Sequence, residues 1–356
     1  MNHPYKSQPP TAFWRHAMVA TPLEAVNPAG VAPFSITPSD AVVTAGSCFA
    51  QHIGPMLRAI RFNFLTTEDA HPIADAALAR QFGYGVFSAR YGNIYTARQL
   101  LQLWYRAYGA FTAQEDVWAG PGGNFIDPFR PQIQPGGFLS WREYKLDREL
   151  HFAAVRQAFE TLDVFVFTLG LTECWRARAD GAVFPLCPGV AGGHFDPAQH
   201  EFHNFSVEEI TSDLIQFIDT LRRRNPSCKM ILTVSPVPLV ATATESHVLA
   251  ATTYSKAVLR VAAEAVTRAR ARVAYFPSYE IIMSQAHGKD SYFGPDRREV
   301  TNGGVAHVMR VFAETYAGFT SPLAPPVPAP ATGSAYTREM AAAMQVLCDE
   351  LALDPG

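Results

Sequence analysis

Three short apolar segments, each ending at or just before a glycine or a serine, constrain the fold of this chain most strongly. They cover residues 40–45, 163–170 and 229–235, and each is followed by a loop and then a helical pattern. Their apolar residues are continuous rather than alternating, which is typical of strands buried on both faces of a parallel sheet. A repeated order of strand, tight turn and helix predicts an α/β fold. We expect a parallel sheet of the five-strand class, flanked by helices.

Apolar residues at helical spacing predict the helices that pack on this sheet. Ile53, Leu57 and Ile60 share one face of the helix that follows the first strand. Ser206, with Glu209 three residues later, forms a favourable start for a second helix. The pattern as a whole predicts helices at 207–224, 249–272 and 301–316, and a short strand at 273–276.

Proline-rich segments suggest how the chain is divided. Residues 1–38 predict an N-terminal arm that packs on the body through Phe13 and Trp14. A run of prolines after the main domain predicts a linker that leads to an amphipathic terminal helix. The predicted divisions are an arm at 1–38, a single domain at 39–320, a linker at 321–334 and a C-terminal helical extension at 335–356.

Two long stretches do not fit the strand–helix repeat. Residues 118–140 and 176–205 are rich in glycine and proline, and the second also contains several histidines. Long ordered segments of this kind in compact enzymes are often lids or substrate walls. We therefore expect two long lid loops beside the site.

The charge balance excludes several classes of protein. A net charge of -3 with only 17% charged residues argues against nucleic-acid binding and hints at a homo-oligomer. No apolar run approaches the ~18 residues that a membrane span needs, and no secretory signal precedes the domain. Five scattered cysteines without a Cys-x-x-Cys pair predict neither a disulfide framework nor a zinc site. The expected location is the cytoplasm.

The turn after the first strand carries the strongest candidate for chemistry. Ligands of open parallel sheets bind beyond the carboxyl ends of the strands, where Gly46, Ser47 and Cys48 lie. A helix N-terminus stabilises an anion there, so either the Ser47 hydroxyl or the Cys48 thiolate is a candidate nucleophile. The alternative is that Ser47 caps the helix and Cys48 is a small buried apolar residue. Ser235, at the end of the third strand, is expected to shape the same pocket.

The segment Thr44–Gly54 resembles the signature of the GSCFA family, which is named for this motif and is related to the SGNH/GDSL hydrolases. The resemblance extends over roughly residues 12 to 316. Further segments that resemble the family, in the expected order, are 91–96, 168–175, 233–238 and 275–280.

The resemblance implies an SGNH-hydrolase-like, flavodoxin-like fold and acyl-transfer chemistry. The implied enzyme is an ester hydrolase or an O-acyltransferase that acts on a carbohydrate or another polyol. Ser47 takes the place of the nucleophile, or Cys48 does if the alignment slips by one residue. Gly92 takes the place of an oxyanion donor, with Asn93 beside it.

The third and fourth blocks depart from the SGNH pattern. Gly170, Thr172 and Glu173 stand where Gly-x-Asn-Asp is expected, so a threonine replaces the oxyanion-binding amide. Asp296 and Glu299 stand where Asp-x-x-His is expected, and a carboxylate is a poor base for a serine hydroxyl. The catalytic histidine of the SGNH pattern is therefore missing from its usual position.

Several other histidines are candidates for the missing base. His307 lies eight residues beyond Glu299, and a packed helical histidine is the competing interpretation. His194, His200 and His203 lie on the expected site side, but their spacing matches no strong metal motif. His52 lies one turn from Cys48 and is a candidate to assist its thiolate.

No cofactor or metal is predicted, because no phosphate-binding loop or dinucleotide fingerprint follows a strand. The expected partner is a small-molecule or carbohydrate acyl substrate. Lys256 is expected to be solvated. Arg297 and Arg298 are candidates to bind an anionic substrate group, but a surface position is the favoured interpretation. Two alternatives stay open: a catalytically degenerate module that binds a glycan or an acyl group, and a Cys48 thiolate enzyme.

Overall fold

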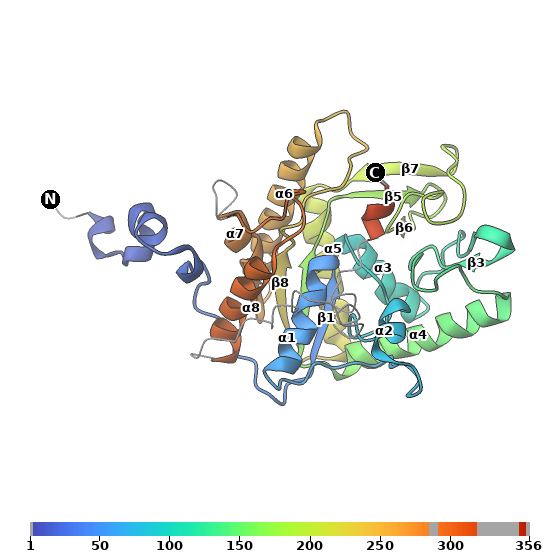
Figure 1. Cartoon of the computed structure of the whole chain (residues 1–356), viewed down its shortest axis with the longest axis horizontal. Coiled ribbons are helices and arrows are strands. Elements are labelled where there is room, and N and C mark those ends of the chain that lie inside the picture. The colour runs from blue at the N-terminus through green and yellow to red at the C-terminus, as the bar shows by residue number, and fades with distance from the viewer. Residues whose placement is uncertain (1–2, 285–290, 319–348, 354–356) are drawn as a thin grey trace, which may run out of the picture.

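A parallel sheet forms the centre of the molecule (Figure 1). The computed structural model describes residues 3–284, 291–318 and 349–353. The sheet has the order β1-β4-β8-β9, and all neighbouring pairs are parallel. Its strands are β1 (Val42–Gly46), β4 (Val164–Leu169), β8 (Lys229–Val234) and β9 (Val273–Phe276). Every residue of β1 and β4 is buried, which confirms the α/β fold predicted from the continuous apolar runs.

The fifth position of the sheet is reduced to one pair of residues. Phe64 forms an isolated parallel bridge with Val42 at the outer edge of β1. With Phe64 as the second position, the order along the sheet is 2-1-3-4-5, that of flavodoxin-like sheets. In that order, successive strands are added on one side of β1 and then, from β4 onward, on the other side. Ligands of such sheets bind at this switch point between β1 and β4. The ends of β1 and β4 therefore mark the expected site.

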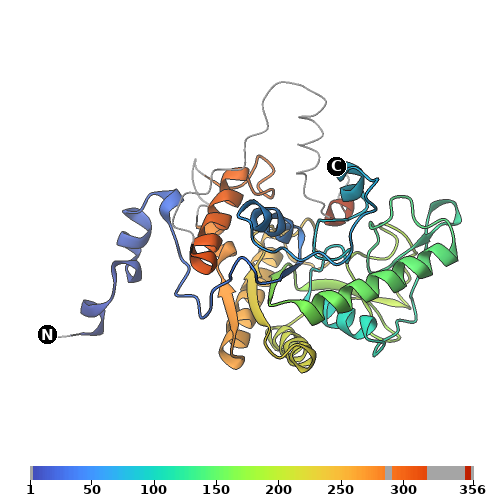
Figure 2. The ribbon, with the colours of Figure 1, turned by 90° about the horizontal axis from the view of Figure 1, so that it is seen from below.

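Helices cover both faces of the sheet (Figures 1 and 2). On one face the core contains residues from α3 (Ala97–Ala107), α4 (Trp141–Thr161), α5 (Val207–Arg224) and α6 (Val248–Ala269). On the other it contains residues from α1 (Ile53–Ala59), α7 (Ser278–Met283) and α8 (Asn302–Ala317). The short α2 (Ala76–Gln81) precedes α3.

Local sequence signals place several of these helices correctly. Ser206 and Glu209 form a capping box at the start of α5. The helix covers Val207–Arg224, the range that the sequence predicts. Ile53, Leu57 and Ile60 are all buried, as their spacing predicts. The predicted helices at 249–272 and 301–316 are α6 and α8, with slightly different ends.

The two predicted lid loops contain short β-strands that the sequence analysis did not predict. Residues 176–205 complete a three-stranded antiparallel sheet of order β6-β5-β7. Residues 118–140 contain a two-stranded hairpin. These strands pair mainly with each other, and the longest has five residues, too short for a clear period-2 pattern. The strands are β2 (Trp118–Ala119), β3 (Phe125–Ile126), β5 (Glu173–Ala177), β6 (Val183–Phe184) and β7 (His200–Asn204).

The N-terminal arm attaches to the body by a different part than expected. Phe13 and Trp14 are 37% and 76% exposed, so they do not anchor it. The buried side chains of Val26 and Ile36 do, and the Ile36 amide donates a hydrogen bond to the Tyr316 carbonyl. Figure 1 shows the first part of the arm, in dark blue, extending away from the domain.

The predicted linker and most of the predicted terminal helix lie outside the described residues. Asp349–Leu353, near the C-terminus, form a short 3-10 helix that lies against the domain (Figure 1). In the part of the chain that the structure describes, no helix combines the length and apolarity needed to cross a bilayer.

Gly46 permits the close contact between β1 and β4. Its φ is +136°, and an added Cβ would lie 2.4 Å from the Thr168 carbonyl oxygen. We expect Gly46→Ala to lower the free energy of unfolding by about 3 kcal/mol or more, since strain and overlap add. Gly109→Ala is the control, because Gly109 also has a positive φ but has open space around it. Equal losses in urea melts of the two variants would contradict the close-contact explanation.

Candidate active site

Ser47 lies at the end of β1, where the short 3-10 helix Cys48–His52 begins. Its amide donates a hydrogen bond to the Thr168 carbonyl over 3.1 Å, which fixes the turn to β4. Its side chain makes no capping hydrogen bond. The Ser47 Oγ is buried, and among the described residues no hydrogen-bond partner lies within reach. The capping interpretation of Ser47 therefore fails, and its hydroxyl remains available for chemistry.

Gly170, just beyond the end of β4, packs directly against this serine. A Cβ on Gly170 would lie 2.9 Å from the Ser47 Cβ and 3.1 Å from the Tyr95 carbonyl oxygen. The Gly170 amide donates to that same Tyr95 carbonyl. The first and third sequence blocks thus meet at the switch point of the sheet, and only a glycine fits between them.

Lys256 reaches the same place from α6 and corrects the expectation that it is solvated. It is 1% exposed, and its Nζ donates a hydrogen bond to the Gly170 carbonyl over 2.7 Å. Burial lowers the pKa of Lys256 to about 8, although the charges of Glu350 and Cys48 oppose this shift. A substantial fraction of the amine is therefore neutral near physiological pH. A buried amine thus lies beside the residues that carry the candidate nucleophiles.

Cys48 is buried, and its charge acts on Lys256. His52 does not supply a positive charge to it, because burial and the nearby Arg80 lower the pKa of His52 to about 4. Its imidazole is neutral at physiological pH. His52 therefore does not assist a Cys48 thiolate as an imidazolium.

The second block lines a cavity next to this turn. Gly92 has a φ of +67° and open space where a Cβ would be. The Asn93 side chain accepts a hydrogen bond from Gln51 Nε2 over 3.1 Å. Its Nδ2 donates to an oxygen of Asp349 over 2.9 Å. The Asn93 side-chain amide therefore already binds a carboxylate oxygen, whereas the resemblance assigns the oxyanion donor of this block to Gly92.

The remaining third-block residues differ in how they are held. The Thr172 amide donates to Ser255 Oγ over 3.1 Å, while the Thr172 hydroxyl is buried and has no hydrogen-bond partner among the described residues. Glu173 begins strand β5 rather than a helix, and it accepts a hydrogen bond from Thr242 Oγ1 over 2.7 Å. Glu173 thus fastens the loop that follows β8.

Ser235 shapes the same edge of the sheet. Its amide donates to the Leu169 carbonyl over 2.8 Å, and its hydroxyl accepts from the Val237 amide over 3.3 Å. Both contacts involve the backbone, so the side chain holds the turn after β8.

In the fourth block, Arg298 is more buried than the two acidic residues. Asp296 accepts hydrogen bonds from the Arg298 and Glu299 amides, which hold the pKa of this carboxyl below its usual range. Glu299 is exposed. Arg298, in contrast, donates to the Pro238 carbonyl and pairs with Glu350 over 3.0 Å. The expectation that Arg298 lies at the surface was wrong, because its side chain is only 17% exposed.

His307 binds the N-terminal arm. Its Nδ1 lies 2.7 Å from the Tyr292 hydroxyl, and its Nε2 lies 2.7 Å from the Val26 carbonyl oxygen. Burial lowers its pKa. Both ring nitrogens are engaged, which favours the packed interpretation of this histidine over the catalytic one.

The other candidate histidines have separate partners. His203 Nε2 lies 2.9 Å from Glu209, and His200 Nε2 lies 2.7 Å from Glu115. His194 is exposed. In the described ranges, no three histidine, cysteine or acidic side chains come together as metal ligands would.

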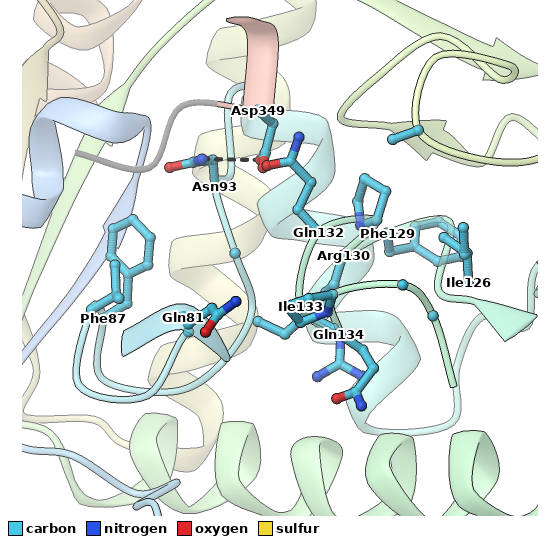
Figure 3. A pocket seen from close by; sticks show the side chains of 18 of the residues that line it. Gln81, Phe87, Asn93, Ile126, Phe129, Arg130, Gln132, Ile133, Gln134 and Asp349 are labelled. Carbon is cyan, nitrogen blue, oxygen red and sulfur yellow. Dashed lines mark hydrogen bonds between the residues drawn. The ribbon is translucent and has the colours of Figure 1, made fainter. Parts of the chain in front are cut away.

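A cavity of about 410 Å³ opens next to Asn93 (Figure 3). Gln51, Gly92, Asn93 and Asp349 line one part of it. The rest of its wall combines apolar groups with side-chain amides. These lining residues include Gln81, Phe87, Ile126, Phe129, Gln132, Ile133 and Gln134.

Ion pairs that include Asp147 of α4 hold the far wall of the cavity. Arg130 pairs with Asp127 over 2.8 Å and with Asp147, on α4, over 2.7 Å. Arg90 pairs with the same Asp147 over 2.6 Å. Because Arg130 and Asp127 are buried, these charges depend on one another and fix the wall.

Sequence reasoning missed Lys256, Asp349 and Glu350. One signal was available for Lys256: Leu259 and Ala263 follow it at i+3 and i+7, so it shares their buried stripe. No local signal identifies the two acidic residues, because their partners lie far away in the sequence.

The family model of the GSCFA family matches residues 41–312. No curated protein sequence matches the chain. Among solved structures, the chain is similar to a carbohydrate esterase family 2 enzyme with a carbohydrate binding domain from Corynascus thermopiles (Myceliophthora fergusii). That match has 15% identity and a TM-score of 0.30, and it covers 81% of this chain and 68% of the other.

A TM-score of 0.30 is too low for this similarity to indicate a function. The family model spans the sheet, both helical layers and all four sequence blocks, from β1 to α8. The chain belongs to the GSCFA family.

Proposed function

We propose that this protein is an acyl-transfer enzyme in which Ser47 is the nucleophile and Lys256 the general base. The substrate class is an ester of a carbohydrate or another polyol, and the acyl group passes to water or to a second hydroxyl. One observation carries the proposal. The Ser47 side chain packs against Gly170, and its Oγ has no hydrogen-bond partner among the described residues. The buried Lys256 amine donates a hydrogen bond to the carbonyl of the same glycine.

The chemistry needs only groups of this chain. Neutral Lys256 accepts the Ser47 proton while Oγ attacks the ester carbonyl carbon. The negative charge that develops on the carbonyl oxygen is stabilised by the Asn93 amide and the Gly92 backbone N–H. The Lys256 ammonium then returns the proton to the departing alkoxide, which leaves an acyl-serine.

The second half of the reaction repeats these roles. Water or a polyol hydroxyl attacks the acyl-serine, and Lys256 takes its proton. The proton passes to Ser47 Oγ as the acyl group leaves, so the enzyme is restored. The Gly170 carbonyl accepts one N–H of the amine, which orients its lone pair.

Lysine is a suitable replacement for the missing histidine. A general base works best when its pKa lies near the operating pH, and the pKa of Lys256 is about 8. Glu299 is exposed and offers no comparable base.

The cavity supports a hydroxylated substrate. Its side-chain amides, from Gln81, Gln132 and Gln134, both donate and accept hydrogen bonds, as sugar hydroxyls require. The rings of Phe87 and Phe129 offer apolar surface beside them. Such a mixture is typical of small-molecule sites.

A fluorophosphonate probe tests the nucleophile directly. We expect the folded protein to be modified at Ser47, located by peptide mapping, and the heat-unfolded protein not to be. Selective modification of Cys48 by a thiol reagent, without any labelling of Ser47, would instead favour the thiolate enzyme.

A second candidate function is a binding module without turnover. It is favoured by the burial of Ser47, which is only 2% exposed, so a substrate needs a rearrangement to reach it. Silence with both reagents, together with glycan binding measured by calorimetry, would establish this alternative and refute the enzyme.

A further inference from the structure

Two acidic side chains near the end of the chain occupy the candidate site. Asp349 and Glu350 are 7% and 5% exposed. We infer that the site contains a carboxylate-binding position formed by Asn93, Arg298 and Lys256, and that these two residues occupy it in place of a carboxylate-bearing substrate. This inference rests on the proposed function and narrows its substrate class.

Asp349 contacts the domain in the way that a bound carboxylate would. Asp349 accepts a hydrogen bond from Asn93 Nδ2 over 2.9 Å, although 256 residues separate the two. In Figure 3 Asp349 comes down from the C-terminal segment toward Asn93. Asn93 is also the side chain to which we assign the developing oxyanion. A carboxylate oxygen of the chain itself thus sits at a position assigned to a substrate oxygen.

The second carboxylate balances two buried cations. Glu350 pairs with Arg298 over 3.0 Å, and its charge acts on Lys256. Leaving buried cations without a counter-charge is costly. A substrate carboxylate can replace Glu350 as the counter-charge of Arg298. Arg298 is well suited to this, because its guanidinium fork matches a carboxylate.

The cost of burying the Asp349 carboxylate is only partly offset by its hydrogen bond. A substrate oxygen can therefore replace this carboxylate. Burial raises the pKa of Asp349 to about 6, and the hydrogen bond from Asn93 only partly offsets this. Asp349 also lines the cavity together with Asn93 and Gly92. A substrate oxygen that binds Asn93 from this cavity takes the place of the Asp349 carboxylate there. An acidic substrate can do so by taking over its contacts.

Calorimetry of the full-length protein tests this position without relying on turnover. The probes are succinate, which represents an acidic acyl group, and glucuronate, which represents an acidic sugar. We expect Glu350→Gln to bind at least one probe 10-fold or more tightly than the wild type, because the competing carboxylate is gone. The probe that gains more affinity identifies which half of the substrate carries the acid.

Three controls make the result specific. Glu245→Gln, at an exposed position, should leave the affinities unchanged. Glucose should not bind more tightly to Glu350→Gln, since it carries no charge. Adding Arg298→Gln to Glu350→Gln should abolish the gain.

Unchanged affinities for both probes in Glu350→Gln would overturn the inference. So would a folded Asp349→Asn variant with wild-type affinities if Glu350→Gln fails to fold, which would make the segment a structural strap. Tight succinate or glucuronate binding without fluorophosphonate labelling of Ser47 would support the carboxylate position and refute the proposed reaction.

Discussion

Ser47→Ala is expected to abolish ester turnover while leaving the fold intact. Loss of a serine nucleophile lowers kcat by about 10⁴-fold or more in enzymes of this type. The Ser47 Oγ has no hydrogen-bond partner among the described residues. Its removal should therefore change the free energy of unfolding by less than about 1 kcal/mol. Hydrolysis of 4-nitrophenyl acetate and a urea melt measure the two effects.

Ser235→Ala is the matched control for this variant. Ser235 is a buried serine at the end of a neighbouring strand, but its hydroxyl accepts a backbone hydrogen bond. It should lose about 1 kcal/mol of stability and keep most of its activity. Full turnover in Ser47→Ala, combined with its loss in Cys48→Ala, would move the nucleophile by one residue.

Lys256→Met is expected to lower kcat by about 10²–10⁴-fold, the usual contribution of a general base. Methionine fills nearly the same space and removes the amine. The variant leaves the Gly170 carbonyl without this donor, which costs about 1–3 kcal/mol, and it removes a buried charge that burial disfavours. We therefore expect a folded protein, which circular dichroism can verify.

The pH dependence of kcat/KM separates a lysine base from a histidine base. Burial lowers the pKa of Lys256 from 10.5 to about 8, so the neutral amine predominates above that pH. Activity should rise with pH and reach half its maximum near pH 8. A histidine of ordinary pKa would place the midpoint near 6.5.

Lys256→Arg distinguishes catalysis from structure. Arginine keeps a cation for the Gly170 carbonyl and Glu350, but it stays protonated at this pH and cannot accept a proton. We expect it to fold and to lack turnover. Wild-type activity in Lys256→Arg would make the buried cation a structural partner of Gly170 and nothing more.

The sheet could be predicted because its signals are local. The apolar runs of β1, β4 and β8 are continuous, and the start of α5 is marked by its capping box. The strands within 118–140 and 176–205 were missed because their partners, rather than their own composition, determine them. Glycines and prolines in these segments suggest loops wherever pairing is not known.

The site was predicted less completely than the fold. Sequence blocks indicated Ser47, Asn93 and Gly170, and the structure brings these three together with the end of the chain. Which residue of a block points inward depends on tertiary contacts. In the fourth block it is Arg298 rather than Asp296, because Asp296 binds the backbone of its own turn.

The cavity wall around Arg130 and the turn at Ser47 are held in place by different contacts. Arg130 anchors the wall to α4, whereas Gly46 and Gly170 hold Ser47 against the sheet. A change at Gln132 or Gln134 therefore alters what the cavity accepts without disturbing the turn. In evolutionary terms the two parts are separable, so if the proposed function holds, lineages can diverge in substrate preference while inheriting the same turn at Ser47.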